Sequence, residues 1–417
     1  MKLCLLAVLL AVPVLGADSK NSCTDCHSIL EGKLQAPAKN FAGDIHRRAG
    51  FSCVDCHGGD RNADDPETAM SSKRGFRGHI SRTAVPQLCA RCHSDANLIH
   101  KFQPQQRVDQ FMQYQTSVHG QRLKKGDSDV ANCVDCHSVH DIREVKDPLS
   151  PVYPLRLPGT CARCHADANH MARYKLPTNQ FAGYQKSVHW DAMAKRGDLS
   201  APSCASCHGN HGARPPQLDS VAAVCGTCHV MMEDLFKSSP HQPVFAAMGL
   251  GGCVVCHGNH EIQSPGLHLL AGANSVCSQC HEPGSAGGVA AAEIAKEITG
   301  LDAALKRSDE ILLQAQSSGM EVSEALLRQR EGKENLVKAA VAVHAFRVAA
   351  VKKPVQEGLA IAAETYSTGQ NALRETTSRR RGLAFSVLAI ACTMIGLWLA
   401  IRALERKPTE DSESPQR

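Results

Sequence analysis

Hydrophobic residues are concentrated at the two ends of the chain, and its middle shows little regular pattern. Residues 3–15 form a short apolar run, whereas residues 383–401 form a longer run without a charged residue. Residues 289–378 place apolar residues at helical spacing. Residues 18–284 contain many Gly and Pro and sustain no periodicity. We therefore expect short helices there, joined by loops, with almost no strand.

The helical region over residues 285–378 is predicted to be a hairpin or stalk followed by a third helix. Ser317-Ser318-Gly319 interrupts the pattern, and Ser323 is a candidate N-cap for the second helix. Pro354 is predicted to mark a further boundary. The apolar positions that define the first helix are Ile294, Ile298, Leu301 and Leu305.

The run of residues 383–401 is predicted to be one C-terminal transmembrane helix. Nineteen uncharged residues are enough to span a bilayer as a helix, and Trp398 near its end suits a membrane interface. Basic residues lie on both sides of the run, so their distribution does not decide its orientation.

The N-terminus decides that orientation. Lys2, the apolar run that follows and the small residues up to Ala17 are typical of a cleaved secretory signal peptide over residues 1–17. We therefore expect everything between this leader and residue 383 to lie outside the cytoplasm. Residues 402–417 are then a short cytoplasmic tail.

Cysteine and histidine are the anomaly in composition. The 417 residues include 20 Cys and 21 His but only 4% aromatic residues, which is a poor supply of large rings for a conventional core. Eighteen of the cysteines belong to nine copies of Cys-x-x-Cys-His. Their cysteines are Cys23, Cys26, Cys53, Cys56, Cys89, Cys92, Cys133, Cys136, Cys161, Cys164, Cys204, Cys207, Cys225, Cys228, Cys253, Cys256, Cys277 and Cys280. Their histidines are His27, His57, His93, His137, His165, His208, His229, His257 and His281.

Cys-x-x-Cys-His is the attachment signature of c-type haem. Its spacing places both sulfurs on one side of a helical turn, and the adjacent histidine reaches the iron. Zinc ribbons do not require a histidine after every second cysteine, a thioredoxin-like site has one such motif, and a disulfide framework would not need the histidines. We therefore predict nine covalently bound haem c groups. About 29 residues for each motif are too few to bury each haem separately, so we expect the haems to pack together.

Two motifs and two further histidines form a repeating unit. Residues 89–140, 161–211 and 225–260 share one order: a motif, a histidine after a Ser-containing segment, a second motif, and a histidine three residues later. Residues 23–57 resemble a first copy, in which Asp60 occupies the place of the trailing histidine.

Nine irons with two histidine ligands each need nine histidines besides those of the motifs. The predicted second ligands are His46, His119, His189 and His241 between motifs, His140, His211 and His260 after motifs, and His79 and His268 ahead of Cys89 and Cys277. His100 and His170 are alternatives to the last two. His344 lies in the second predicted helix and is interpreted as an ordinary helical residue.

Charge favours redox proteins as partners over nucleic acid. The formal net charge is +5, and the chain contains no long basic stretch with interleaved aromatic residues. Residues 18–284 carry 27 Lys+Arg and 25 Asp+Glu. Nine haems, with two propionates each, would bring this region to about −7. We therefore expect basic or neutral partner surfaces.

The motifs, together with the Ser-Val-His, Ser-Pro-His and Cys-His-Gly-Asn-His elements, resemble those of bacterial multihaem c-type cytochromes. The closest similarity is to the cytochrome c3-like group with doubled Cys-x-x-Cys-His motifs, which is found in anaerobic respiratory chains. The resemblance covers roughly residues 20–284. It implies a mainly α fold with extensive loops, a haem-packed domain over residues 18–284, and electron transfer. The C-terminal anchor differs from the N-terminal anchor of the small tetrahaem quinol dehydrogenases.

We accordingly expect a cytochrome anchored in the bacterial inner membrane, with its haem domain in the periplasm. It would pass electrons between a quinol-linked membrane donor and periplasmic redox partners, and residues 289–378 are available to pair with a second copy or another subunit. The alternative is a multihaem reductase of a small nitrogen or sulfur compound. An enzyme needs an open haem, and the motif at His57 is the candidate because of Asp60. A role limited to assembly through residues 289–378 would leave nine haems superfluous.

Overall fold

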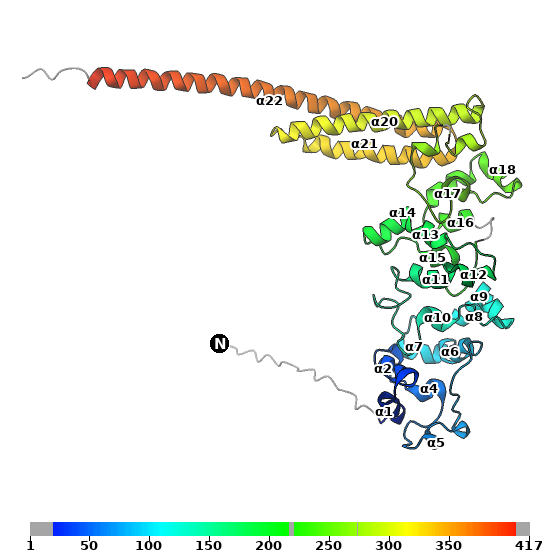
Figure 1. Cartoon of the computed structure of the whole chain (residues 1–417). Coiled ribbons are helices and arrows are strands. Elements are labelled where there is room, and N and C mark those ends of the chain that lie inside the picture. The colour runs from blue at the N-terminus through cyan, green and yellow to red at the C-terminus, as the bar shows by residue number, and fades with distance from the viewer. Residues whose placement is uncertain (1–19, 217–220, 273, 406–417) are drawn as a thin grey trace, which may run out of the picture. The chain divides into compact units, whose positions relative to one another are not determined.

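The computed structural model describes residues 20–216, 221–272 and 274–405 (Figure 1). These residues form two compact units. Unit 1 contains the residues up to 216 together with 258–264, and unit 2 contains the remaining residues from 221 onward. The predicted signal peptide and residues 406–417 of the predicted tail lie outside the described residues.

Unit 1 consists of short helices joined by loops, and no strand occurs anywhere in the described ranges. The predicted mainly α fold is therefore confirmed. The helices that carry motifs are α1 (Ser22–Ile29), α4 (Cys53–His57), α6 (Val85–His93), α10 (Cys133–His137), α11 (Leu157–His165) and α15 (Cys204–His208). The others are α2 (Ala36–Phe41), α3 (Ile45–Arg48), α5 (Pro66–Ala69), α7 (Ala96–Phe102), α8 (Gln110–Thr116), α9 (Val118–Lys124), α12 (Ala168–Ala172), α13 (Gln180–Gln185) and α14 (Val188–Trp190).

Local sequence fixes where the motif helices of unit 1 begin. Ser52 and Asn132 each form a capping box with the residue three positions later, which satisfies the free amides at the start of α4 and α10. Helices α6 and α11 instead start with Pro86 and Pro158 in their first turn, where the missing proline N–H costs no hydrogen bond. Local sequence thus fixes the first residues of these four motif helices.

Unit 2 begins with short helices and continues into three long ones (Figure 1). The short helices are α16 (Val221–Gly226), α17 (Val230–Lys237), α18 (His241–Ala247) and α19 (Cys253–His257), followed by the 3₁₀ turns η5 (Leu267–Leu269) and η6 (Cys277–Gln279). The long helices are α20 (Ala286–Ser317), α21 (Ser323–Ala342) and α22 (Val348–Glu405), and the 3₁₀ turn η7 (Val343–Ala345) joins the last two.

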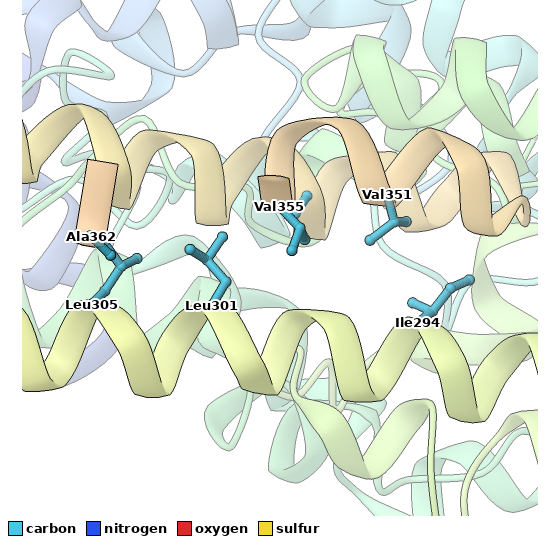
Figure 2. Close-up of a cluster of buried hydrophobic side chains, with 7 residues drawn as sticks. Ile294, Leu301, Leu305, Val351, Val355 and Ala362 are labelled. Carbon is cyan, nitrogen blue, oxygen red and sulfur yellow. The ribbon is translucent and has the colours of Figure 1, made fainter. Parts of the chain in front are cut away.

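The long helices pack as an antiparallel bundle over the first part of α22. Leu301 and Leu305 of α20 face Val355 and Ala362 of α22 in its core (Figure 2). The buried positions recur at alternating spacings of three and four residues, which is the repeat that keeps one stripe of each helix against its neighbours in a left-handed coiled coil. The bundle is therefore a rigid element leading away from the last motif.

A buried polar network also joins the three long helices. The Gln329 amide donates to the Leu305 carbonyl at 2.8 Å, and the Thr365 hydroxyl donates to the Gln329 side-chain oxygen at 2.8 Å. The Ser308 and Thr365 hydroxyls lie 2.7 Å apart. Because each buried group has a partner, the network fixes the register of the helices.

The boundaries of the bundle differ in part from the sequence predictions. Gly319 has a φ of 79° and follows the end of α20, as the predicted break requires. Ser323 is the first residue of α21, and Val322 occupies the cap position. Pro354 does not end a segment, because α22 already starts at Val348 and includes it.

The C-terminal part of α22 is exposed and apolar. Among the described residues, α22 is the one helix long and apolar enough to cross a membrane, with a mean hydropathy of 2.3 over its best window and none of that window buried. Arg402 lies over the Trp398 ring, 4.5 Å from its centroid. The helix is therefore compatible with a membrane anchor that continues directly from the bundle.

Candidate metal centres

Histidine rings from distant parts of the sequence meet in pairs. In each pair, a motif histidine faces a second histidine of the same unit, with ring centroids 5.9–6.1 Å apart. In unit 1 the pairs include His46–His93, His57–His140, His119–His165, His137–His211 and His208–His260. In unit 2 they include His241–His281 and His257–His344.

This spacing fits one metal ion between two imidazoles. A metal–imidazole bond is about 2 Å long, so two opposed nitrogens lie about 4 Å apart and their ring centroids about 6 Å apart. The Nδ1 atoms of His27 and His57 each lie 2.9 Å from a backbone carbonyl oxygen, of Leu34 and Gly78 respectively. A donated Nδ1–H leaves Nε2 as the ligand atom. Within the described ranges, no cluster of three or more His, Cys, Asp or Glu side chains gathers as a zinc site would require.

The mutual angle of the two rings alternates along the chain. At the third, fifth and ninth motifs the ring planes cross at 83°, 61° and 85°. At the second, fourth, sixth and eighth motifs the planes are nearly parallel, at 22°, 11°, 11° and 22°. The odd and even motifs for which a facing histidine has been described therefore offer two different ligand geometries.

The pairing also follows a fixed offset along the sequence. The second, fourth and sixth motifs each face the histidine that trails the motif two places later, as His57 faces His140. The third, fifth and ninth motifs face a histidine from between the two preceding motifs, as His93 faces His46. Every repeating unit therefore completes the site of a neighbour rather than its own.

Backbone hydrogen bonds join the two kinds of facing histidine. The residue before an inter-motif histidine donates its amide to the carbonyl two residues after a trailing histidine. These bonds are Ile45 to Ile142 at 2.8 Å, Val118 to Ala213 at 3.1 Å, and Val188 to Ile262 at 2.9 Å. Each bond therefore positions one inter-motif histidine and one trailing histidine, which face the motif histidines of two different sites. The geometries of these two sites thus depend on each other.

A buried cap precedes each inter-motif histidine by two residues. The caps are Asp44, Ser117, Ser187 and Ser239, none of them more than 5% exposed. Asp44 accepts hydrogen bonds from the His46 Nδ1 at 2.9 Å, the His46 amide at 2.8 Å and the Ile142 amide at 2.7 Å. Burial alone would raise the pKa of Asp44, but these hydrogen bonds, the one from the His46 ring first, hold it below its usual value. The carboxylate thus fixes the tautomer of His46 and points its Nε2 toward His93.

Replacing Asp44 by asparagine should therefore change the site of His46 and His93 most strongly. The asparagine still caps α3 but no longer carries the charge that makes the His46 imidazole more basic, so we expect one midpoint potential to rise by about 60 mV, a tenfold change in a one-electron equilibrium. Redox titration followed by absorbance measures this shift. Asp95→Asn is the matched control, because Asp95 caps α7 through the amides of Asn97 and Leu98 alone. Equal titrations for both variants would contradict the assigned role of Asp44.

The motifs adjoin one another in sequence order inside each unit. Hydrogen bonding from Cys53 lowers the pKa of Cys23 to about 6, so the first and second motifs touch. Burial raises the pKa of Cys56, and the charge of Cys89 raises it further, which places the third motif beside the second. The same kinds of interaction join Cys89–Cys133, Cys161–Cys136 and Cys161–Cys204 in unit 1, and Cys225–Cys253 and Cys256–Cys277 in unit 2.

Arginines within odd motifs also reach the preceding motif. Arg91 donates to the Asp55 carbonyl at 3.2 Å, and Arg163 donates to the Asp135 carbonyl. These bonds tie the third motif to the second and the fifth to the fourth. An arginine side chain therefore holds each of these two odd motifs against the motif before it.

The structure does not bring every predicted ligand into a pair. His79 and His268 are exposed, and no ring contact joins either of them to a motif histidine within the described ranges. His100 has its Nε2 3.0 Å from the Gln106 carbonyl oxygen, and His170 packs on Tyr174. His189 does not belong with these four histidines: it lies on α14 after its cap Ser187, at the position expected from the repeat, and it has an interaction partner.

His344 is the facing residue that sequence analysis left out. Its position in a helical segment carries no motif of its own. The pairing rule for even motifs indicates that such a residue is needed. Each earlier even motif faces the histidine that trails the motif two places later, and the eighth motif has no motif two places later. A histidine from outside the repeats is therefore needed at His257.

Residues 45–166 and 197–282 match the family described as Cytochrome c3. The match supports a multihaem c-type cytochrome with covalently bound haem c and a role in electron transfer. No curated protein and no solved structure matches the chain.

Proposed function

We propose that this chain is a nonahaem c-type cytochrome, anchored in the inner membrane, that conducts electrons between a quinol-linked membrane donor and redox proteins of the periplasm. The observation that carries the proposal is the set of histidine pairs spaced for one iron, following the motifs in order. The motif cysteines hold haem c covalently and the motif histidines are proximal ligands. The facing histidines and His189 are the distal ligands.

The arrangement of the residues favours conduction over catalysis. Haem iron supplies a one-electron centre at each motif. At the sites with a facing histidine, imidazoles on both sides keep small molecules off the iron, and ligation that stays the same in both oxidation states limits reorganisation. Because successive motifs adjoin within each unit, electrons pass between neighbouring sites without a mobile carrier.

The anchor is supported by the exposed apolar end of α22. Side chains such as Leu388, Ile395 and Leu399 are more than half exposed, which is stable in lipid and unfavourable in water. Arg379, Arg380 and Arg381 precede this segment on the same helix. With the haem units in the periplasm, the chain ends in the cytoplasm.

Haem quantification and low-temperature EPR of the oxidised protein test this function. We expect about nine haems per chain, nearly all low-spin, in two populations, because parallel and crossed imidazole planes split the iron d orbitals differently. The crossed sites should give the more anisotropic signal. A single low-spin population would contradict the alternating geometry, and a haem count far below nine would contradict the proposed function.

An enzyme remains the second candidate, and the site at His27 favours it. Within the described ranges, no ring contact places a histidine opposite His27. His57, by contrast, faces His140, while Asp60 binds Arg74. A stoichiometric high-spin EPR signal that shifts with nitrite, hydroxylamine or a sulfur oxyanion would make the reductase the better conclusion.

A further inference from the structure

We infer that His344, at the end of the helical bundle, is the distal ligand of the iron held by His257, so that the bundle completes the chain of metal centres. This inference rests on the proposed haem chemistry. It assigns a ligand to a segment that lies outside the repeats and outside the matched family region. The bundle then serves as a functional end of the electron path as well as a stalk.

The geometry of this pair equals that of the other even motifs. The rings of His257 and His344 have centroids 6.0 Å apart and planes at 22°. The pair His57–His140 has centroids 6.1 Å apart and the same angle. The eighth site is thus built like the second, although its facing histidine comes from a different kind of segment.

Hydrogen bonding orients His344 for this role. Its Nδ1 lies 2.9 Å from the Val341 carbonyl oxygen, at the end of α21. With the Nδ1 proton donated to this carbonyl, Nε2 keeps its lone pair for a metal. The proximal residues His27 and His57 are fixed by a carbonyl in the same way.

The turn after His344 makes a second contact with the haem-binding part of unit 2. Phe346 has a φ of 51° and ends η7. Its ring centroid lies 4.0 Å from that of His241, the residue that faces His281 of the ninth motif. The turn between α21 and α22 therefore contains the facing residue of the eighth site, His344, and contacts that of the ninth site, His241.

The start of α20 makes a third contact. A side chain at Gly287 would collide with the imidazole of His281, so the first turn of the helix lies directly on the ninth motif. Ser285 caps this turn through the Gly288 amide at 3.2 Å. Because both ends of the helical hairpin meet the last two sites, the bundle is positioned to hold His344 in place.

The offset shows why such a residue is required. Each earlier even motif receives its facing histidine from a later repeat, as His208 receives His260. No repeat follows the ninth motif. His344 thus replaces the missing trailing histidine, in the way that a capping segment closes the last unit of a repeat protein.

The test is His344→Gly in the full-length, detergent-solubilised protein, with His268→Gly as the matched control. We expect the His344 variant to convert one haem in nine from low-spin to high-spin by EPR and absorbance, and added imidazole to restore the low-spin signal. The control should match the wild type, because His268 is exposed and, among the residues that the structure describes, no ring contact joins it to a motif histidine. An unchanged His344 variant, or a high-spin signal in the control, would overturn the inference.

His344→Met provides a second test that can be made even if the glycine variant does not fold. Methionine retains a ligand atom and a comparable volume, so we expect an unchanged helical circular dichroism signal and one midpoint potential raised by about 0.1 V or more. Loss of helicity without a potential shift would show a structural role only and overturn the inference. A wild-type protein with about nine haems, nearly all of them low-spin, supports the proposed function independently of either variant.

Discussion

Replacing His211 by methionine should interrupt the electron path in the middle of unit 1. His211 faces His137 at 6.1 Å with the planes 11° apart, so the variant exchanges one of two imidazoles for a thioether. Thioether ligation raises the potential, and we expect a rise of about 0.1 V or more within the roughly 0.8 V that axial ligands span. Each 59 mV favours the reduced site about tenfold, so an electron is trapped there and transfer beyond it slows.

His100→Met is the matched control for this experiment. His100 lies in the same unit, and its Nε2 is occupied by the Gln106 carbonyl. Redox titration should show one shifted haem for His211→Met and none for the control. In stopped-flow experiments, reduction of the haems should then slow once electrons reach the altered site at His137. Identical titrations of the two variants would show that His211 is not a ligand.

Leu301→Ala should produce the largest loss of stability in the bundle. Leu301 is fully buried on α20 and lies against Gly358 of α22, where its methyl groups fill the space that a larger residue would occupy. Truncating a buried leucine costs about 2–5 kcal/mol through lost burial and the cavity that remains. Thermal unfolding of the full-length protein, followed by circular dichroism at a helix band, measures the change.

The control for the bundle is Leu313→Ala on the same helix. Leu313 is 57% exposed, so its truncation should change the free energy of unfolding by about 0.5 kcal/mol or less. If Leu301→Ala also converts the His257 site to high-spin, the bundle and the eighth metal centre unfold together. Equal stability of the two variants would contradict the described helix packing.

The sequence predicted the fold class well because its strongest signals are local. Nine Cys-x-x-Cys-His turns, the break at Gly319 and the uncharged stretch at the C-terminus each depend on a few neighbouring residues. Pro354 was misjudged as a boundary because α22 extends across it from Val348. Helix propensity alone does not include the packing of α22 against two other helices. This packing stabilises the helical turn that contains Pro354.

The candidate site was harder to predict, because its pairing is not local. The inter-motif and trailing histidines were recognised from the repeat, but spacing does not show that His46 faces His93 rather than the nearer His27. His344 was dismissed because it carries no motif and sits among helix-forming residues. The pairing of each even motif with a histidine from the next repeat is seen only in three dimensions. Only this pairing shows that His257 would otherwise lack a facing residue.

The same offset has a consequence for how the protein is made. In a chain exported from its N-terminus, each even motif histidine emerges before the histidine that faces it, which follows roughly 50 to 90 residues later, as His140 follows His57. Under the proposed function and topology, the haem of each of these even motifs must therefore wait, with one face of its iron accessible, until the segment with its facing histidine has crossed the membrane. The eighth waits longest, because His344 emerges only once the helical hairpin has been translocated. On this proposal, maturation ends with the segment that precedes the anchor, so a chain truncated before His344 would lack the residue that faces His257.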